Sequence, residues 1–393
     1  MDKQMLKYFG ILGVLIVVMI LFFMITGSGG GKYEYRDIEL LMVRAARKYA
    51  TEIPKILPSS ENSSQTISSK TLINLGYLDD LSTYAMDETN CNGSVEIYQT
   101  ISGIYNYVPT LNCGRYFNSK KLSEKIIEDN YGGTTQGPGL YVRYDGKFLT
   151  DENDIDRLPA DEYVFRGDTV NNYILVENML WRVVSIDKDG NIIAIMVDNI
   201  KGNTTWDNRY NAETLDYDGV NEYEMNGIKS RIMQSAESIF NEEVALIDKL
   251  YSGRIKYMVA PMDVCVGKRS PSDEGNDGSV ECQKVLENQY IAALPVYSFM
   301  SASLDENCVR ATSKSCGNYN FLASVGSGWW TATGNADNTS EAYVLRGRVL
   351  ISQSCSYRDG IHPIIAFGSR SMYSKGSGTY DDPYIIRYFL QNA

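Results

Sequence analysis

Cysteine and histidine are the residues of this chain that most readily carry chemistry, and their number limits what that chemistry can be. A Ser-His-Asp triad needs a histidine that accepts the proton of the nucleophile. The one histidine, His362, is followed by Pro363 in an apolar stretch, which favours a buried histidine with one backbone hydrogen bond over a general base. One histidine and no Cys-x-x-Cys pair also leave a zinc cluster without enough ligands. The sequence therefore predicts no catalytic residue, no metal and no cofactor.

The seven cysteines are instead distributed like a disulfide framework. All of them come after the apolar N-terminal run, as expected where the folded part of a chain lies in an oxidising compartment. Sequence alone does not fix the connectivity, but closeness along the chain favours three pairs and leaves Cys355 as a free thiol. These pairs are Cys91–Cys113, Cys265–Cys282 and Cys308–Cys316. The alternative is a set of reduced, buried thiols.

Two further motifs suggest ligands but lack the residues that those ligands need. Residues 151–156 (DENDID) are rich in carboxylates, but they lack the glycine and the terminal glutamate of an EF-hand loop. We therefore expect a solvated acidic loop there. Gly326-Ser327-Gly328 is not followed by the Gly-Lys-[Ser/Thr] of a phosphate-binding loop.

Aromatic side chains are the remaining candidates for recognition, and the chain has 29 tyrosines. Trp329 and Trp330 are adjacent on a predicted strand, so their side chains point to opposite faces. We expect Trp330 and Trp181 in the core. We expect Trp329 to be exposed and to form, with Tyr343 on the next strand, a ligand-binding surface. The alternative surface is the long loop of residues 266–279.

These residues must be held by elements that the hydropathy of the chain predicts, and the first is a membrane anchor. No charged residue occurs from Tyr8 to Gly31, a run long enough for the roughly 20 residues that cross a bilayer. Lys3 and Lys7 precede the run and favour a cytoplasmic N-terminus. The sequence thus predicts that residues 8–26 span the lipid bilayer and that the bulk of the chain is extracellular. A cleaved signal peptide is the alternative, but no Ala-x-Ala-like site ends the run.

The composition predicts folded domains after the anchor. A chain of 393 residues has room for the anchor and about two domains. With 44% hydrophobic and 22% charged residues, most of it should fold. The net charge of −12 provides no basic surface, which excludes nucleic acid as the expected partner.

The first predicted domain combines helices with a hairpin. Residues 33–56 have helical periodicity, a short helix is expected at residues 72–78, and residues 91–98 and 104–108 alternate like two strands. The order "TLINLGYL" then "CNGSVEIY" and "YNYVPTLNCGRYF" resembles small pilin-like ectodomains of low-GC Gram-positive bacteria over about residues 33–117. The resemblance implies a pilin-like architecture. A pilin helix normally runs unbroken from the membrane and carries a Glu in its apolar run; the GSGGG break and the missing Glu argue against assembly into a pilus.

The second predicted domain opens with a meander of three strands, at residues 173–176, 179–186 and 192–197. Helical stretches come next, at residues 228–239 and 244–251. The order "NYILVENMLWRVVSIDKDGNIIAI", "SGWWTAT", "EAYVL" and "DGIHPIIAF" resembles C-type-lectin-like domains of bacterial surface proteins over about residues 161–370. His362 stands where such domains usually carry Arg, and no calcium-binding motif of the family is present, so the resemblance does not imply calcium-dependent sugar binding.

We therefore expect an α+β protein with a transmembrane helix, a small helix-plus-hairpin domain, and a C-type-lectin-like domain of antiparallel strands and two helices. The expected boundaries are 1–31 for the anchor and its glycine-rich break, 32–120 for the pilin-like domain, 121–160 for a linker and first strands, and 161–393 for the C-type-lectin-like domain.

The expected function is binding or adhesion at the cell surface, or a structural role there, from a single-pass anchor in the cell membrane. The expected partner is a protein or glycan at the cell surface, and homo- or hetero-assembly is left open. One alternative is a minor pilin-like component of a secretion, pilus or DNA-uptake assembly. Another is an enzyme of the formylglycine-generating type, which needs a cysteine pair near the C-terminal end of its domain, whereas Cys355 has no partner after it.

Overall fold

The fold is described from a computed structural model of the chain. The structure describes residues 33, 35–59, 64–85, 90–99, 105–113, 116–117, 121–131, 137–149, 160–176, 179–199, 202–244, 258–326 and 328–386. In these ranges no helix has the length and apolarity to cross a membrane, and the anchor expected at residues 8–26 lies outside them. The described part is a mixed α+β protein, mostly of strands with few helices, as the sequence predicts, and it divides into two compact units.

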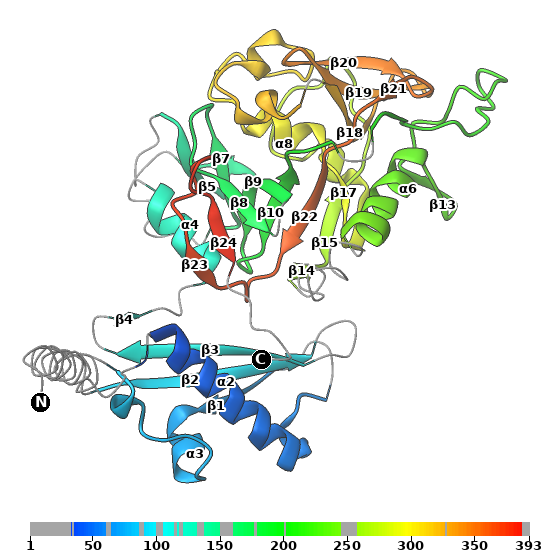
Figure 1. The fold of residues 1–393 in the computed structure, drawn as a ribbon. Helices are drawn as coiled ribbons and strands as arrows, with labels where there is room; N and C mark the ends of the chain where they lie inside the picture. Colours follow the sequence, from blue (N-terminus) through cyan, green and yellow to red (C-terminus); the bar gives the residue numbers. More distant parts are fainter. Residues whose placement is uncertain are drawn as a thin grey trace, which may run out of the picture. The chain divides into compact units, whose positions relative to one another are not determined.

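The described part of the first unit, up to residue 117, contains helical elements and four strands (Figure 1). Its helical elements are α2 (Tyr35–Glu52), η1 (Pro54–Ile56), α3 (Ser69–Asn74) and η2 (Leu81–Thr83). Its strands are β1 (Ser64–Ser68), β2 (Asn92–Gln99), β3 (Tyr105–Cys113) and β4 (Tyr116–Phe117). They form an antiparallel sheet in the order β1-β2-β3-β4.

The helix α2 packs against this sheet because its apolar residues recur every three or four positions. Ile38, Met42 and Ala46 are fully buried, as are Val95 and Leu111 of the sheet. The predicted helix and hairpin are both present, although the helix ends at Glu52 rather than Ile56.

The second unit, residues 121–386, holds the larger core. Its helical elements are α4 (Leu122–Asn130), α6 (Arg231–Ser238), η3 (Ile239–Val244), η5 (Glu281–Gln283), α8 (Val296–Ser301), η6 (Lys314–Gly317) and η7 (Phe321–Ser324). Its long strands are β5 (Gly139–Tyr144), β7 (Glu162–Arg166), β8 (Tyr173–Val176), β9 (Met179–Asp187), β10 (Ile192–Met196), β15 (Met262–Cys265), β16 (Val285–Gln289), β18 (Gly328–Gly334), β19 (Glu341–Arg346), β20 (Val349–Ser354) and β22 (Pro363–Phe367). Its short strands are β6 (Lys147–Phe148), β11 (Thr204–Thr205), β12 (Glu224–Met225), β13 (Ile228–Lys229), β14 (Val259–Ala260), β17 (Ala292–Ala293), β21 (Arg358–Asp359), β23 (Tyr373–Lys375) and β24 (Tyr384–Ile386).

The main sheet of this unit runs β14-β22-β10-β9-β7-β5-β6, and the predicted meander β8-β9-β10 lies within it. The last strand, β24, pairs in parallel with β8, so the end of the unit closes against one of its early strands (Figure 1). The other strand pairs of the described residues are antiparallel. A smaller antiparallel sheet of the same unit has the order β18-β19-β20.

The structure also shows how the expected domain boundaries relate to the two units. Residues 121–160, expected as a linker and first strands, provide the helix α4 and the strands β5 and β6 of the second unit. The predicted helix at residues 228–239 is present as α6, preceded by the short strand β13. The helix predicted at residues 244–251 lies outside the described residues except for Val244. The acidic loop at residues 151–156 lies wholly outside them.

Candidate functional site

The aromatic surface predicted on β18 and β19 is not exposed. Trp329 and Tyr343 are both 0% exposed, so the prediction that they form a ligand-binding surface is wrong. Trp330 and Trp181 are also fully buried, as predicted.

Both faces of β18 are covered, which is why its two neighbouring tryptophans are both buried. On one face the ring of Trp329 packs edge-on against Phe299 of α8, and its indole N–H donates to the carbonyl of Val325 at 2.7 Å. On the other face the indole N–H of Trp330 donates to the carbonyl of Thr204 at 3.0 Å. Strand alternation predicts that the two side chains point to opposite faces of the strand. Whether both faces are covered depends on tertiary packing.

Tyr343 is covered by the loop that was the alternative recognition surface. Its hydroxyl donates to the backbone carbonyl of Arg269 at 3.1 Å. The side chain of Arg269 is fully buried and forms an ion pair with Glu281, with 2.8 Å between Nε and Oε1. The loop is therefore fastened into the core at one end.

The three predicted disulfides are confirmed. Cys91 is bonded to Cys113, Cys265 to Cys282 and Cys308 to Cys316. Cys355 is free and buried. Burial raises the pKa of its thiol far above the usual range, and the carboxylate of Asp207 acts in the same direction, so the thiol stays protonated.

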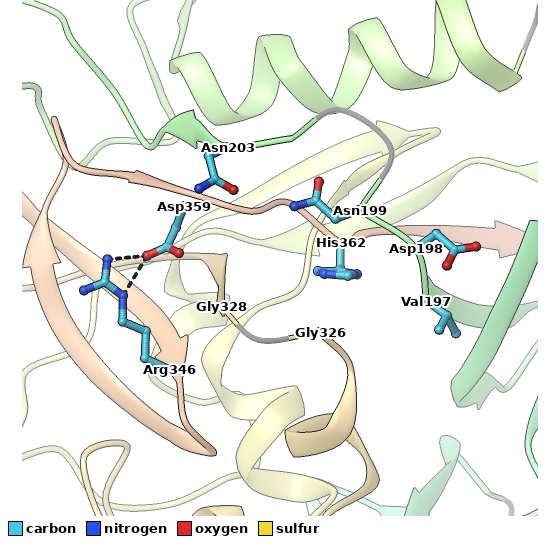
Figure 2. A pocket seen from close by; sticks show the side chains of 9 residues that line it. All are labelled: Val197, Asp198, Asn199, Asn203, Gly326, Gly328, Arg346, Asp359 and His362. Carbon is cyan, nitrogen blue, oxygen red and sulfur yellow. Dashed lines mark hydrogen bonds and ion pairs between the residues drawn. The ribbon is translucent and has the colours of Figure 1, made fainter.

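The second unit contains a polar pocket of about 380 Å³ (Figure 2). It lies where β10, β18, β19, β21 and the segment before β22 meet. Its lining comprises Val197, Asp198, Asn199, Asn203, Gly326, Gly328, Arg346, Asp359 and His362.

His362, the one histidine of the chain, contributes a buried imidazole to this pocket. Its Nδ1 lies 2.9 Å from the carbonyl oxygen of Met196 at the end of β10. Burial lowers the pKa of His362 and outweighs the opposing effects of that hydrogen bond and of the carboxylate of Asp198. The ring is therefore neutral near pH 7, Nδ1 carries the proton, and Nε2 retains a lone pair.

Asp359 and Arg346 form the opposite side of the pocket. Nε and Nη2 of Arg346 both donate to Oδ2 of Asp359, at 2.8 and 2.5 Å. The guanidinium also stacks on the half-exposed ring of Tyr357, with 4.3 Å to the ring centroid. Arg346 thus holds Asp359 through one oxygen, and the other oxygen, Oδ1, faces Gly328.

The two glycines of the pocket allow close approach of the backbone to these polar groups. A Cβ atom on Gly326 would lie 2.4 Å from Nε2 of His362, and one on Gly328 would lie 2.8 Å from Oδ1 of Asp359. Gly326 also has a φ of +66°, which side-chain-bearing residues rarely adopt. Any larger residue would therefore fill the pocket at its two polar atoms.

The segment that carries Gly326 is positioned by Arg182 of β9, which follows Trp181 in the predicted meander. Its Nη1 donates to the carbonyl of Phe321 and to the hydroxyl of Ser324, both at 3.3 Å, and its Nε donates to Asn172 at 2.9 Å. Burial lowers the pKa of Arg182 to about 10, so it stays charged at neutral pH. Arg182 positions the pocket wall without lining it.

Asn199 and Asn203 add exposed amides at the pocket margin, from the segment between β10 and β11. Figure 2 shows the imidazole of His362 between Gly326 and Asn199, with Asn203 near Asp359. The carboxylate of Asp198 points away from Asp359.

Sequence reasoning placed His362 in an apolar strand but did not connect it with Arg346, Asp359 or the two asparagines. Asp359 lies only three residues before His362, in the stretch DGIHPIIAF, whereas Arg346 and the two asparagines come from other segments of the chain. Two local signals were present: the short spacing of Asp359 and His362, and Gly326-Ser327-Gly328, which was considered only as a phosphate-binding loop.

The pocket offers several hydrogen-bonding groups. A carboxylate oxygen and a neutral imidazole nitrogen accept hydrogen bonds, and amide groups both donate and accept them. Within the described ranges no group of three or more His, Cys, Asp and Glu side chains is arranged to hold a metal ion. This set of groups is suited to binding a hydroxyl-rich ligand.

No family model, curated protein or solved structure matches this chain.

Proposed function

We propose that this chain is a cell-surface recognition protein whose second unit binds a hydroxyl-rich ligand, a glycan, in the polar pocket around His362. The observation that carries the proposal is the pair of acceptors at the two glycines, Oδ1 of Asp359 and Nε2 of His362. Sugar hydroxyls donate and accept hydrogen bonds and match acceptors and amides that a rigid scaffold holds in place.

The resemblance to C-type-lectin-like and pilin-like surface domains and the predicted anchor at residues 8–26 support the same proposal. The three disulfides fit an oxidising, extracellular environment. In this arrangement the anchor holds the chain in the cell membrane with its N-terminus in the cytoplasm, and the second unit is displayed outside as a C-type-lectin-like module.

The state of the cysteines bears on an enzymatic alternative of the formylglycine-generating type. Such chemistry needs an accessible, reactive thiol, whereas Cys355 is fully buried and its pKa is raised. The other six cysteines are bonded to one another. Recognition needs neither a thiolate nor a base.

A glycan-binding screen on the chain from residue 32 onward tests the proposal. We expect wild-type protein to bind a subset of glycans, and Asp359→Asn, which removes the carboxylate charge but nearly keeps the shape, to weaken that binding. Glu274→Gln is the matched control, because Glu274 also pairs with an arginine, Arg310, but lies outside the pocket. Glycan binding that is equally strong in Asp359→Asn, or no glycan binding by wild-type protein, would overturn the proposal.

A further inference from the structure

A loop between β11 and β12 presents large apolar side chains to solvent, and none of its residues lines the polar pocket. Tyr210, Leu215 and Tyr217 are 48%, 74% and 71% exposed. The two tyrosine rings meet edge to face, with centroids 5.3 Å apart. We call these three side chains the loop tip. Figure 1 shows the loop as the green segment that projects from the body of the second unit.

The base of the loop is fixed by Asp207, which is almost fully buried. Its Oδ2 accepts from Nε of Arg209 at 2.7 Å and from the backbone N–H of Val220 at 2.9 Å. Its own backbone N–H donates to the carbonyl of Cys355 at 3.1 Å. The two ends of the loop are therefore tied to each other and to the turn that follows β20.

The outer part of the loop is closed by further hydrogen bonds. The backbone N–H of Asn211 donates to the carbonyl of Asp216 at 2.8 Å, and its side-chain amide donates to the carbonyl of Gly219 at 3.0 Å. The hydroxyl of Thr214 donates to the carboxylate of Asp218 at 2.7 Å. A loop held in this way loses little conformational entropy when it binds a partner.

Leu215 combines two features that stability does not explain. Its φ of +58° lies in the left-handed region, which is strained for a bulky residue and suits Gly or Asn. Its side chain is 74% exposed, so it gains little from burial within the chain. A strained, exposed apolar residue on a rigid loop is typical of a contact site.

We propose that the loop tip docks into an apolar cleft of another protein, and that basic residues edge that cleft. The loop carries the acidic residues Glu213, Asp216 and Asp218 around its tip. Its one cation, Arg209, is turned inward and donates to Asp207 and to the carbonyl of Val220. The outward charge of the tip is thus negative, and a partner of complementary charge is basic.

The same charge disfavours two other occupants. Carboxylates are repelled by the anionic headgroups of a membrane surface. A second copy of this chain carries the same net charge of −12 and the same acidic tip. Tyrosine is also one of the residue types that are enriched in protein–protein hot spots.

The first test separates function from stability at one residue. Leu215→Gly relieves the backbone strain and removes the apolar contact, so we expect the melting temperature of the full chain to stay the same or rise. If Leu215 holds the loop together instead, the substitution lowers the melting temperature, and the proposal fails.

The second test identifies the occupant with a photo-crosslinking phenylalanine analogue at position 217 in the full chain, in the cells that make it. The result expected is a crosslink to another protein at a site with apolar residues beside Lys or Arg. That protein, once purified, should bind the Leu215→Ala variant about 30-fold more weakly than wild type. It should bind Tyr380→Ala equally well, since Tyr380 is similarly exposed but outside the loop.

Four outcomes of the second test would overturn the proposal. They are crosslinks to lipid only, crosslinks to a second copy of this chain only, no crosslink, and a crosslinked protein whose binding is unchanged by Leu215→Ala.

Discussion

The indole of Trp329 lies edge-on to the imidazole of His362, with ring centroids 6.2 Å apart. Trp329 also forms a parallel β-bridge with Gly360, two residues before His362, so β18 is joined at the pocket to the segment before β22. A tryptophan expected at the surface therefore forms part of the support beneath the pocket, and it holds the histidine whose Nε2 faces Gly326.

Truncation of Trp329 should destabilise the second unit. We expect Trp329→Ala to lower the free energy of unfolding by about 3–5 kcal/mol, because the side chain is fully buried and its N–H is hydrogen-bonded. Denaturant titration measures this change. Tyr357→Ala is the control: its ring is 48% exposed, and its loss should cost less than about 1 kcal/mol. Equal effects of the two substitutions would show that Trp329 is not core.

Protonation of His362 should destabilise the fold in mild acid. Because burial lowers the pKa of His362, the unfolded chain binds a proton at this residue at a higher pH than the folded chain does. Its contribution to stability is complete above about pH 6.5 and is lost as the pH falls from there toward the folded-state pKa. We expect the melting temperature to fall between pH 7 and pH 5, and to fall less in His362→Gln. An identical pH dependence in the two proteins would contradict the assignment.

The buried ion pair of Arg269 and Glu281 should matter more than an exposed one. Both side chains are 0% exposed, so Glu281→Gln leaves a buried guanidinium without its counter-charge, at a cost of about 3–5 kcal/mol. Arg310 and Glu274 form a comparable pair with side chains 53% and 61% exposed, and Glu274→Gln should cost less than about 1 kcal/mol. Chemical denaturation of the two variants side by side decides between these values.

The disulfide Cys91–Cys113 should stabilise the first unit. It closes a loop with a sequence separation of 22 residues, which corresponds to about 3 kcal/mol in the chain-entropy model. The double variant Cys91→Ser, Cys113→Ser should therefore unfold at lower denaturant concentration.

Peptide mapping without reduction should find alkylation at Cys355 alone, and only after denaturation, because its thiol is buried. Alkylated Cys91 in the native protein would contradict the pairing.

Local patterns predicted the elements of this chain better than its surfaces. The meander β8-β9-β10 arises from strand alternation and a turn at Gly190, and the three disulfides join cysteines that are close in sequence. The burial of Trp329 depends on α8 and on the segment of His362, which approach β18 only in the folded chain. Asp359 and His362 are three residues apart, but Arg346 pairs with Asp359 from another strand and Asn203 comes from a distant segment. The sequence therefore indicates only part of the pocket.

The central claim is that the polar pocket is where the second unit binds its ligand. Amide hydrogen–deuterium exchange of the chain from residue 32 onward, with and without a glycan found in the screen, tests it most directly. We predict that the glycan slows exchange in peptides around Asn199, Gly326 and Asp359, which come from three separate segments and meet at the pocket. Slower exchange confined to the first unit or to strands away from these three segments would contradict the claim.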